Sequence, residues 1–407
     1  MILFTNARLV CPDGGERTGS LLVDGETIVA SGTVEAPAEA ERIDCRGRVL
    51  APAIVDLGVF AVDKEACAAG GIARVALMPD QAPVLDDPGI IRRAALIGKP
   101  ELWVHPLAAA THALGGAELA EMAINASAGA KGVATGRGWI ADAGVMRRVL
   151  AYAADLGLTV VTHAENTGLT AGAVATEGET ATRLGLPAAP AIAEALAVAR
   201  DLMLVEDTGA RLHFRQVTTD AALELVRRAK ARGLPVTCGI TPAHLMLADT
   251  DISDFRTFAR LSPPLRCQAD RLAALAALAD GTIDVLASGH DPRGPEEKRL
   301  PFVDAAPGMA GAETLLALGL GFVRDGRISL DRLFALLARN PSRIVGLPGG
   351  SLAIGCPADL VLVDPDAPWQ VRGEAMRARA GNTPFDGLPV QGKALRLWKG
   401  GKQIFAA

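Results

Sequence analysis

The sequence predicts an α/β protein: a TIM-like (β/α)8 barrel with a small flanking β-sandwich domain built from both termini. Three observations lead to this prediction. Short strand patterns separated by Gly-containing turns fill residues 1–52. From residue 53 onward, short apolar runs alternate with longer helical segments, which is typical of a parallel sheet. After residue 349 the strand patterns return.

The terminal strands belong together in this prediction. Strand patterns occur at 2–4, 7–10, 21–23 and 27–29 near the start of the chain, and at 359–363 and 395–405 near its end. We therefore expect residues 1–52 and 350–407 to form one composite β-sandwich domain. Residues 53–349 are then expected to form the barrel.

Repeated strand–helix units define the central region. Helical patterns are predicted over 117–128, 146–156, 191–205, 221–231 and 270–279, and each is followed by a short strand pattern. About eight such units in roughly 300 residues favour a closed barrel over an open sheet. In a barrel of this kind, functional side chains are expected at the carboxyl ends of the strands.

Composition excludes several classes of function. The net charge of −5 shows no electrostatic footprint for nucleic acid. The six cysteines form no CxxC pair, which favours reduced thiols and a cytoplasmic location. The amino terminus lacks the pattern of a secretory signal, and the apolar runs are too short to span a bilayer, so no membrane association is expected.

Specific motifs occur along nearly the whole chain. They read KE at 64–65, AAGG at 68–71, MPD at 78–80, TPAHL at 241–245, SPPLR at 262–266, DGTIDV at 280–285 and NTPF at 382–385. Together they resemble the motifs of dihydroorotases in the amidohydrolase superfamily. The resemblance implies a protein of pyrimidine biosynthesis with the fold of a hydrolase that acts on cyclic amide C–N bonds.

The chemistry of that family depends on metal ions. A metal-bound hydroxide attacks the cyclic amide, and the metal polarises the carbonyl group. The family supplies an HxH pair on the first barrel strand, a mid-barrel Asp or modified Lys, two later histidines and a final Asp that is also the general base. Only His163, in the phrase THAEN, matches this ligand set here. The other family ligand positions fall on residues without a suitable donor, namely Gly58, Phe60, Gly136, Gln216 and Gly289.

The positions that recognise substrate in the family differ as well. The family Asn of MPN is Asp80, the Asn of NPPLR is Ser262, and the last His of APH is Arg293. Asp80 would repel a carboxylate substrate, whereas Arg293 could attract one. We keep these three residues as candidates for substrate binding.

The combined losses predict a pseudoenzyme without dihydroorotase activity and without a metal cofactor. Such a chain resembles the non-catalytic dihydroorotase-like subunits that accompany the catalytic subunit of bacterial aspartate transcarbamoylase and support its assembly. That resemblance implies a structural partner of aspartate transcarbamoylase and a homo-oligomer.

Two alternatives remain at this point. The first is a cyclic amidohydrolase with an altered site, metal-free or holding one zinc ion, in which His163, His290 and Asp291 are the candidate catalytic residues. The second is a small-molecule sensor that binds a pyrimidine precursor without turning it over. The simplest structural interpretation of His163 is a histidine hydrogen-bonded inside a former pocket.

Overall fold

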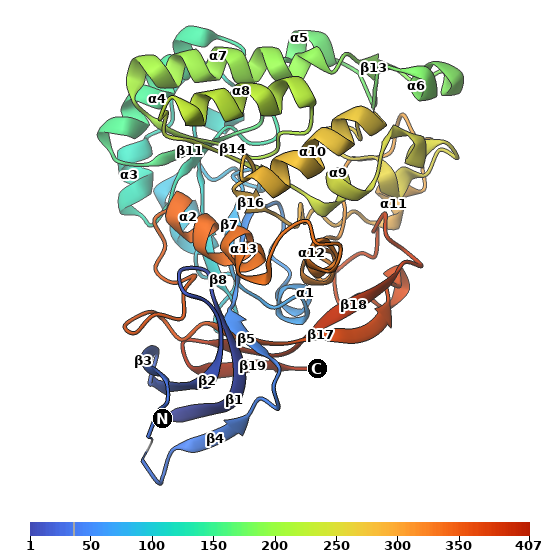
Figure 1. Ribbon diagram of the computed structural model, residues 1–407. Helices are drawn as coiled ribbons and strands as arrows, with labels where there is room; N and C mark the ends of the chain where they lie inside the picture. Colours follow the sequence, from blue (N-terminus) through green and yellow to red (C-terminus); the bar gives the residue numbers. More distant parts are fainter. Residues whose placement is uncertain (36) are drawn as a thin grey trace.

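The computed structural model describes residues 1–35 and 37–407. A barrel surrounded by helices forms the upper part of the molecule in Figure 1, and a β domain containing both chain ends lies below it. The prediction of a TIM-like barrel with a flanking β domain is confirmed.

Parallel strands form the wall of the barrel. Two groups are hydrogen-bonded, in the orders β6-β7-β8 and β9-β10-β11-β14-β15-β16. Only Leu107 separates β8 from β9, so these two short strands together occupy one position in the wall. The barrel therefore has eight strand positions. The amide of Phe60 donates to the carbonyl of His290 at 3.0 Å, which joins the last strand position to the first. The strands are β6 (Ile54–Val59), β7 (Ile72–Leu77), β8 (Trp103–Pro106), β9 (Ala108–Ala109), β10 (Val133–Ala134), β11 (Thr159–Thr162), β14 (Arg211–Phe214), β15 (Val236–Ile240) and β16 (Val285–Leu286).

Amphipathic helices cover the outside of this wall. In α8 (Asp220–Ala231) the buried residues Ala222, Leu223, Val226 and Ala229 recur at helical spacing. Thr219 caps this helix by accepting from the amide of Ala222. The other longer helices are α1 (Lys64–Ala69), α2 (Pro88–Ala94), α3 (Met122–Ser127), α4 (Ala143–Asp155), α6 (Glu179–Leu184), α7 (Ile192–Thr208), α10 (Gln268–Asp280) and α12 (Leu315–Arg324).

One predicted helix is wrong in its first half. The pattern at 117–128 indicated a continuous helix, but α3 begins only at Met122. The preceding residues form bends and one isolated bridge between Leu119 and Thr111, because the amide of His112 donates to the carbonyl of Glu118 and the amide of Ala120 donates to the carbonyl of Ala110. These bonds tie the segment to the loop after β9, so tertiary contacts override its helical propensity.

The terminal strands form one sheet in the order β19-β18-β17-β5-β1-β2-β3, with β4 added to β1. The sheet curves around its own core: Phe4 of β1 and Trp398 of β18 meet edge to face, with ring centroids 4.9 Å apart, although their strands are not neighbours. The strands are β1 (Ile2–Cys11), β2 (Gly15–Asp24), β3 (Thr27–Gly32), β4 (Glu41–Asp44), β5 (Val49–Pro52), β17 (Leu360–Gln370), β18 (Pro389–Lys399) and β19 (Lys402–Ala406).

A buried ion pair connects the two parts of the molecule. The guanidinium of Arg74, on β7, donates to Oδ2 of Asp359 at 2.6 Å, and both side chains are buried. Oδ1 of Asp359 accepts from the amide of Gly400 at 2.8 Å. This carboxylate therefore ties a barrel strand to the hairpin β18–β19 across the boundary between the domains.

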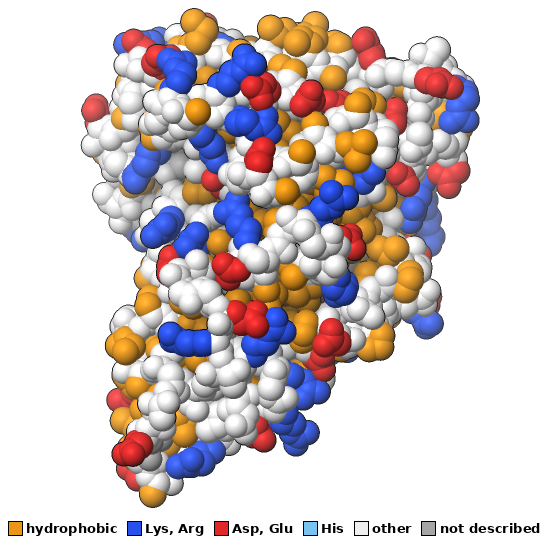
Figure 2. Space-filling model, viewed as in Figure 1, with side chains coloured by type: hydrophobic (Ala, Val, Ile, Leu, Met, Phe, Trp, Pro, Cys, Tyr) orange, Lys and Arg blue, Asp and Glu red, His pale blue; other side chains and the backbone are white. Residues whose placement is uncertain are grey.

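The surface carries charges of both signs. Figure 2 shows Lys and Arg side chains interspersed with Asp and Glu over the face in view, without a broad field of one sign. Within residues 1–35 and 37–407, no helix is both long and apolar enough to cross a membrane.

Candidate functional site at the barrel mouth

The carboxyl ends of four barrel strands bring the sequence-predicted positions together. Phe60 follows β6, His163 follows β11, Gln216 follows β14 and Gly289 follows β16. Phe60, Gln216 and Gly289 line one small cavity of about 30 Å³, together with Arg137 and Arg215. The replaced family positions therefore meet at the barrel mouth, and two arginines lie among them.

Arg215 takes up the space beside the first strand. Gly58 has a φ of +96°, and a Cβ atom on it would lie 3.3 Å from Cδ of Arg215. The Arg215 side chain is buried, and its guanidinium lies 5.1 Å from the centre of the Phe60 ring. Burial lowers the pKa of Arg215 to about 10, so this guanidinium stays positively charged at neutral pH.

His163 has both ring nitrogens engaged. Nδ1 lies 3.2 Å from Nη2 of Arg215, and Nε2 lies 3.1 Å from Oε2 of Glu165. A guanidinium can only donate and a carboxylate can only accept, so Nδ1 is the acceptor and Nε2 carries the proton. The lone pair that would bind a metal ion is therefore occupied by Arg215.

Behind His163 lies a buried network of charges. Arg266 donates from Nη2 to Oε1 of Glu165 at 2.8 Å and lies 3.5 Å from Oε1 of Glu194. Glu194 also accepts from the amides of Thr218 and Thr219 at 2.9 and 2.7 Å. Burial alone would raise the pKa of Glu165, but the hydrogen bond from His163 and the charge of Arg266 outweigh it and hold this pKa at about 2.

Arg137 covers the mouth from the other side. Its guanidinium stacks 3.8 Å from the centre of the Phe60 ring and donates to Oδ2 of Asp291 at 2.6 Å. Arg293 donates to the same Asp291 oxygen at 3.0 Å. Asp291 is thus held between two guanidiniums, which satisfies its charge without a metal ion.

The candidate residues His290 and Asp291 do not join His163. The imidazole of His290 is fully buried, with Nδ1 accepting from the amide of Ala312 at 3.3 Å and Nε2 at 3.8 Å from Oδ2 of Asp63. The described part of the chain contains no group of three or more His, Cys, Asp or Glu side chains that could hold a metal ion. The structure therefore does not assemble the one-metal alternative from these three residues.

The three substrate-binding candidates lie around the same mouth. Ser262 lines the small cavity and a neighbouring one of about 220 Å³, which His163 and Glu165 also line. Asp80 and Arg293 line a third cavity of about 400 Å³ on the other side of Arg137. Oδ1 of Asp80 accepts from the amide of Arg137 at 2.9 Å, and this carboxylate would lie only 2.9 Å from a Cβ atom at Gly136.

Metal ligation does not fit this arrangement. Metal ions of the kind used in hydrolysis need several imidazole and carboxylate donors directed at one point. Here Gly58 and Gly289 have no side-chain donor, the His163 lone pair is occupied, and the positive charges of Arg215 and Arg137 repel a dication. The barrel mouth thus presents guanidinium groups rather than the imidazole and carboxylate donors that metal ligation needs.

Several of these groups were missed in the sequence. Arg215 directly precedes Gln216, and Arg137 directly follows Gly136, so both stand next to positions that the motifs marked. A positively charged residue next to each of these motif positions could have been taken as a prediction of a positively charged barrel mouth. Glu165 stands in the phrase THAEN and Arg266 ends the motif SPPLR, so the motifs contained both residues. Nothing in the sequence indicated that they pair with each other and with Glu194, because the three lie far apart in the chain.

The barrel, its flanking β domain and the position of the mouth together define a protein with the architecture of barrel hydrolases. The model of the amidohydrolase family matches residues 104–404, and the chain belongs to this family. A dihydroorotase of Syntrophotalea carbinolica is 38% identical over 411 residues, covering 97% of this chain and 96% of the relative.

Two further relatives and one solved structure extend this finding. A dihydroorotase of Mycobacterium leprae is 40% identical over 91% of both chains. A dihydroorotase-like protein of Pseudomonas aeruginosa is 38% identical over 96% of both chains. Among solved structures, the L-hydantoinase (dihydropyrimidinase) of Arthrobacter aurescens superposes with a TM-score of 0.88 at 25% identity, covering 99% of this chain and 95% of the other.

Proposed function

We propose that this chain is a dihydroorotase-like protein without dihydroorotase activity. The observation that carries the proposal is the Arg215 side chain, whose methylene groups pack against Gly58 and whose guanidinium binds His163, the one residue that matches a family ligand. A hydroxide able to open a cyclic amide near neutral pH requires a metal ion or a strong general base. The position of the family base is Gly289, which has no side chain.

We further propose that the chain serves as a structural partner of aspartate transcarbamoylase. This part of the proposal is supported by the resemblance to non-catalytic dihydroorotase-like subunits and by the near full-length similarity to dihydroorotase-like relatives. Such a role needs an intact fold, because a partner subunit must present its surface. It does not need a barrel mouth that binds a substrate.

The metal content of the purified protein tests the first proposal. The protein is purified without added zinc, dialysed against zinc, and assayed for bound metal and for hydrolysis of dihydroorotate, with the dihydroorotase of Syntrophotalea carbinolica as the positive control. We expect much less than one zinc per chain and no hydrolysis above the background rate. Stoichiometric zinc together with turnover of dihydroorotate would refute the proposal.

A second experiment addresses the partner. The chain is expressed together with the aspartate transcarbamoylase of its own organism, and native molecular mass is measured by light scattering after size-exclusion chromatography. We expect the two chains to elute as one assembly whose transcarbamoylase activity depends on both. Separate elution at micromolar concentration, with full activity of the transcarbamoylase alone, would refute this role.

The altered-hydrolase alternative has its own test. If His163 takes part in catalysis, His163→Ala must abolish any cyclic-amide hydrolysis that the protein shows. A hydrolytic rate that is unchanged in this variant would assign the activity to a contaminant or to another site.

A further inference from the structure

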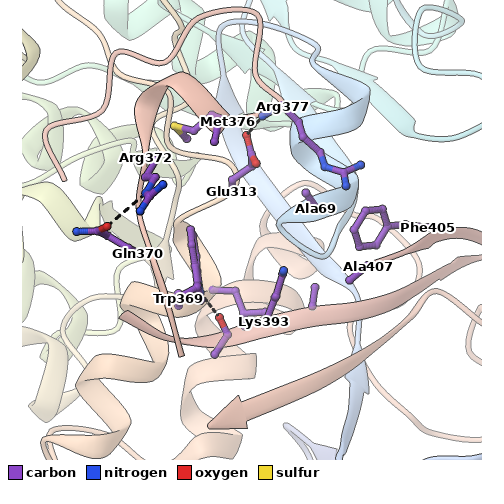
Figure 3. Close-up of a pocket in the computed structure, with 15 residues that line it drawn as sticks. Ala69, Glu313, Trp369, Gln370, Arg372, Met376, Arg377, Lys393, Phe405 and Ala407 are labelled. Carbon is purple, nitrogen blue, oxygen red and sulfur yellow. Dashed lines mark hydrogen bonds between the residues drawn. The ribbon is translucent and has the colours of Figure 1, made fainter. Parts of the chain in front are cut away.

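A second cavity lies away from the barrel mouth, at the junction of the β domain and the barrel (Figure 3). Its volume is about 290 Å³. It is enclosed by the end of α1, the start of α12 and the strands β17, β18 and β19. The segment from Arg372 to Ala380 separates it from the mouth, since Arg377 lines this cavity whereas Arg379 lines the polar cavity at the mouth.

Three cationic side chains surround the cavity. Arg372, Arg377 and Lys393 all line it and are exposed. None of them forms an ion pair with a carboxylate within residues 1–35 and 37–407. Arg372 has one weak side-chain bond, from Nε to the amide oxygen of Gln370 at 3.3 Å. Donors and positive charge are therefore available to a ligand.

Two aromatic rings form walls of the same space. Figure 3 shows Trp369 and Phe405 on opposite sides of the cavity. The indole Nε1 of Trp369 donates to the carbonyl of Gly392 at 2.9 Å, which fixes the orientation of the ring. The guanidinium of Arg377 lies 5.2 Å from the centre of the Phe405 ring, so charge and aromatic surface occur side by side.

Small residues keep the cavity open between these walls. Ala69, Ala317 and Ala394 line it, as does Gly392. The backbone at Gly392 has a φ of +107°, and a Cβ atom there would lie 2.3 Å from Cδ1 of Leu320. Close packing of β18 on α12 therefore requires glycine at this position, and it places the Gly392 carbonyl where it orients Trp369.

The one acidic side chain in the lining is already engaged. Oε1 of Glu313 accepts from the amides of Arg377 and Ala378 at 2.7 and 3.1 Å. These two hydrogen bonds anchor the segment from Arg372 to Ala380 and stabilise the Glu313 carboxylate. The side chains around the cavity retain an excess of positive charge.

From these features we propose that the junction cavity binds a small planar aromatic anion, with its ring against Trp369 and its carboxylate or phosphate group against Lys393 and the two arginines. Pockets at domain junctions with apolar walls and a few convergent polar groups are common ligand sites. This proposal is independent of the one made for the barrel mouth, because it uses none of the mouth residues.

Calorimetric titration with two pairs of probes tests the chemistry. Benzoate is compared with benzamide, which has the same ring and shape without the charge, and phenyl phosphate is compared with inorganic phosphate, which has the charge without the ring. We expect benzoate or phenyl phosphate to saturate at about 1 mM or below, as is typical of ligands this small, and each to bind at least tenfold more tightly than its matched probe. The stronger of the two identifies the anionic group.

Three variants locate the site. Lys393→Met is expected to weaken binding of the stronger probe about tenfold, a loss of one charge-assisted contact. Lys402→Met is the matched control, because Lys402 is an exposed lysine on the adjoining strand that does not line the cavity. Trp369→Leu is expected to abolish the preference for aromatic anions, and its circular dichroism and melting temperature establish that it folds.

Three outcomes would overturn the proposal. The first is no saturable binding of either aromatic anion at millimolar concentration. The second is equal binding of the charged and neutral probes. The third is binding that survives Lys393→Met but is lost in Arg137→Ala. That result would place the ligand at the barrel mouth instead of the junction cavity, and it would not decide whether the protein has dihydroorotase activity.

Discussion

The side chain of Arg215 lies against the backbone of Gly58, with Cδ 3.3 Å from the point where a Cβ atom at position 58 would stand. The two residues belong to different strand positions of the barrel, since Gly58 lies on β6 and Arg215 directly follows β14. The absence of a side chain at position 58 creates the space, and the methylene groups of the buried Arg215 side chain fill it. This contact fills the space beside the first barrel strand with protein atoms.

Gly58→Ala should destabilise the protein more than an equally strained glycine elsewhere. A non-glycine residue at a φ of +96° costs about 1–2 kcal/mol, and the new methyl group would also displace the Arg215 side chain. Gly355→Ala is the matched control, because Gly355 has a φ of +90° and no atom lies within 4 Å of the point where its Cβ atom would stand. We expect the free energy of unfolding, measured in urea, to fall by roughly 1 kcal/mol more for Gly58→Ala than for the control. Equal losses would show that Arg215 is not constrained by position 58.

The ion pair between Arg74 and Asp359 should dominate the coupling of the two domains. Asp359→Ala leaves the buried guanidinium of Arg74 without its partner and is expected to cost about 3–5 kcal/mol. Glu16→Ala removes the carboxylate from the exposed pair of Arg8 and Glu16, and should cost less than about 1 kcal/mol. Thermal unfolding followed by calorimetry measures both. A small loss for Asp359→Ala would show that the domains are held together by apolar contacts instead.

Buried neutral histidines should make the protein sensitive to mild acid. Burial lowers the pKa of His213 to about 3 and of His244 to about 4, and partial burial together with the charge of Arg74 lowers the pKa of the half-buried His105 to about 3. An unfolded histidine takes up its proton near pH 6.5, so these residues favour the folded state above that pH. As the pH falls from 6.5 towards 4, each lowers the free energy of unfolding by up to about 1.4 kcal/mol per pH unit.

Replacing one histidine checks this origin of the pH dependence. In the original protein, Nδ1 of His213 lies 2.9 Å from Oγ1 of Thr237. The side-chain amide in His213→Asn can keep this hydrogen bond, while the group that titrates is removed. The slope of the unfolding free energy between pH 6 and pH 4.5 should then decrease by up to about 1.4 kcal/mol per pH unit. A slope unchanged from that of the original protein would assign the acid sensitivity to other groups.

The large-scale architecture was predictable because its signals are local. Alternating strands and helices over 53–349 indicated the barrel, and the strand 359–363 and the hairpin near the carboxyl terminus were found in β17, β18 and β19. The segment at 117–121 was mispredicted because its apolar residues suit a helix, whereas in the structure it is hydrogen-bonded to residues 110 and 112 instead.

For the candidate site, the sequence indicated only which motif positions carry residues other than the metal ligands of the family. At the motif positions the sequence has Gly58, Phe60 and Gly289, which offer no metal donor, and Gln216, whose amide is a weak ligand, and this could be read letter by letter. The contacts of the guanidinium groups at the mouth could not be read in that way. The guanidinium of Arg215 reaches His163 from a neighbouring strand, and Arg137 reaches Asp291 across 154 positions of the chain. Such contacts depend on the closed barrel rather than on spacing in the sequence.

The contact between Arg215 and position 58 also limits substitution at both positions. A side chain at position 58 would meet Cδ and Cγ of Arg215, and removal of the Arg215 side chain alone would leave a void beside the glycine. The two positions are therefore energetically coupled, so the cost of changing both is expected to differ from the sum of the two single costs. A design that introduces a metal ligand at position 58 has to replace Arg215 in the same step.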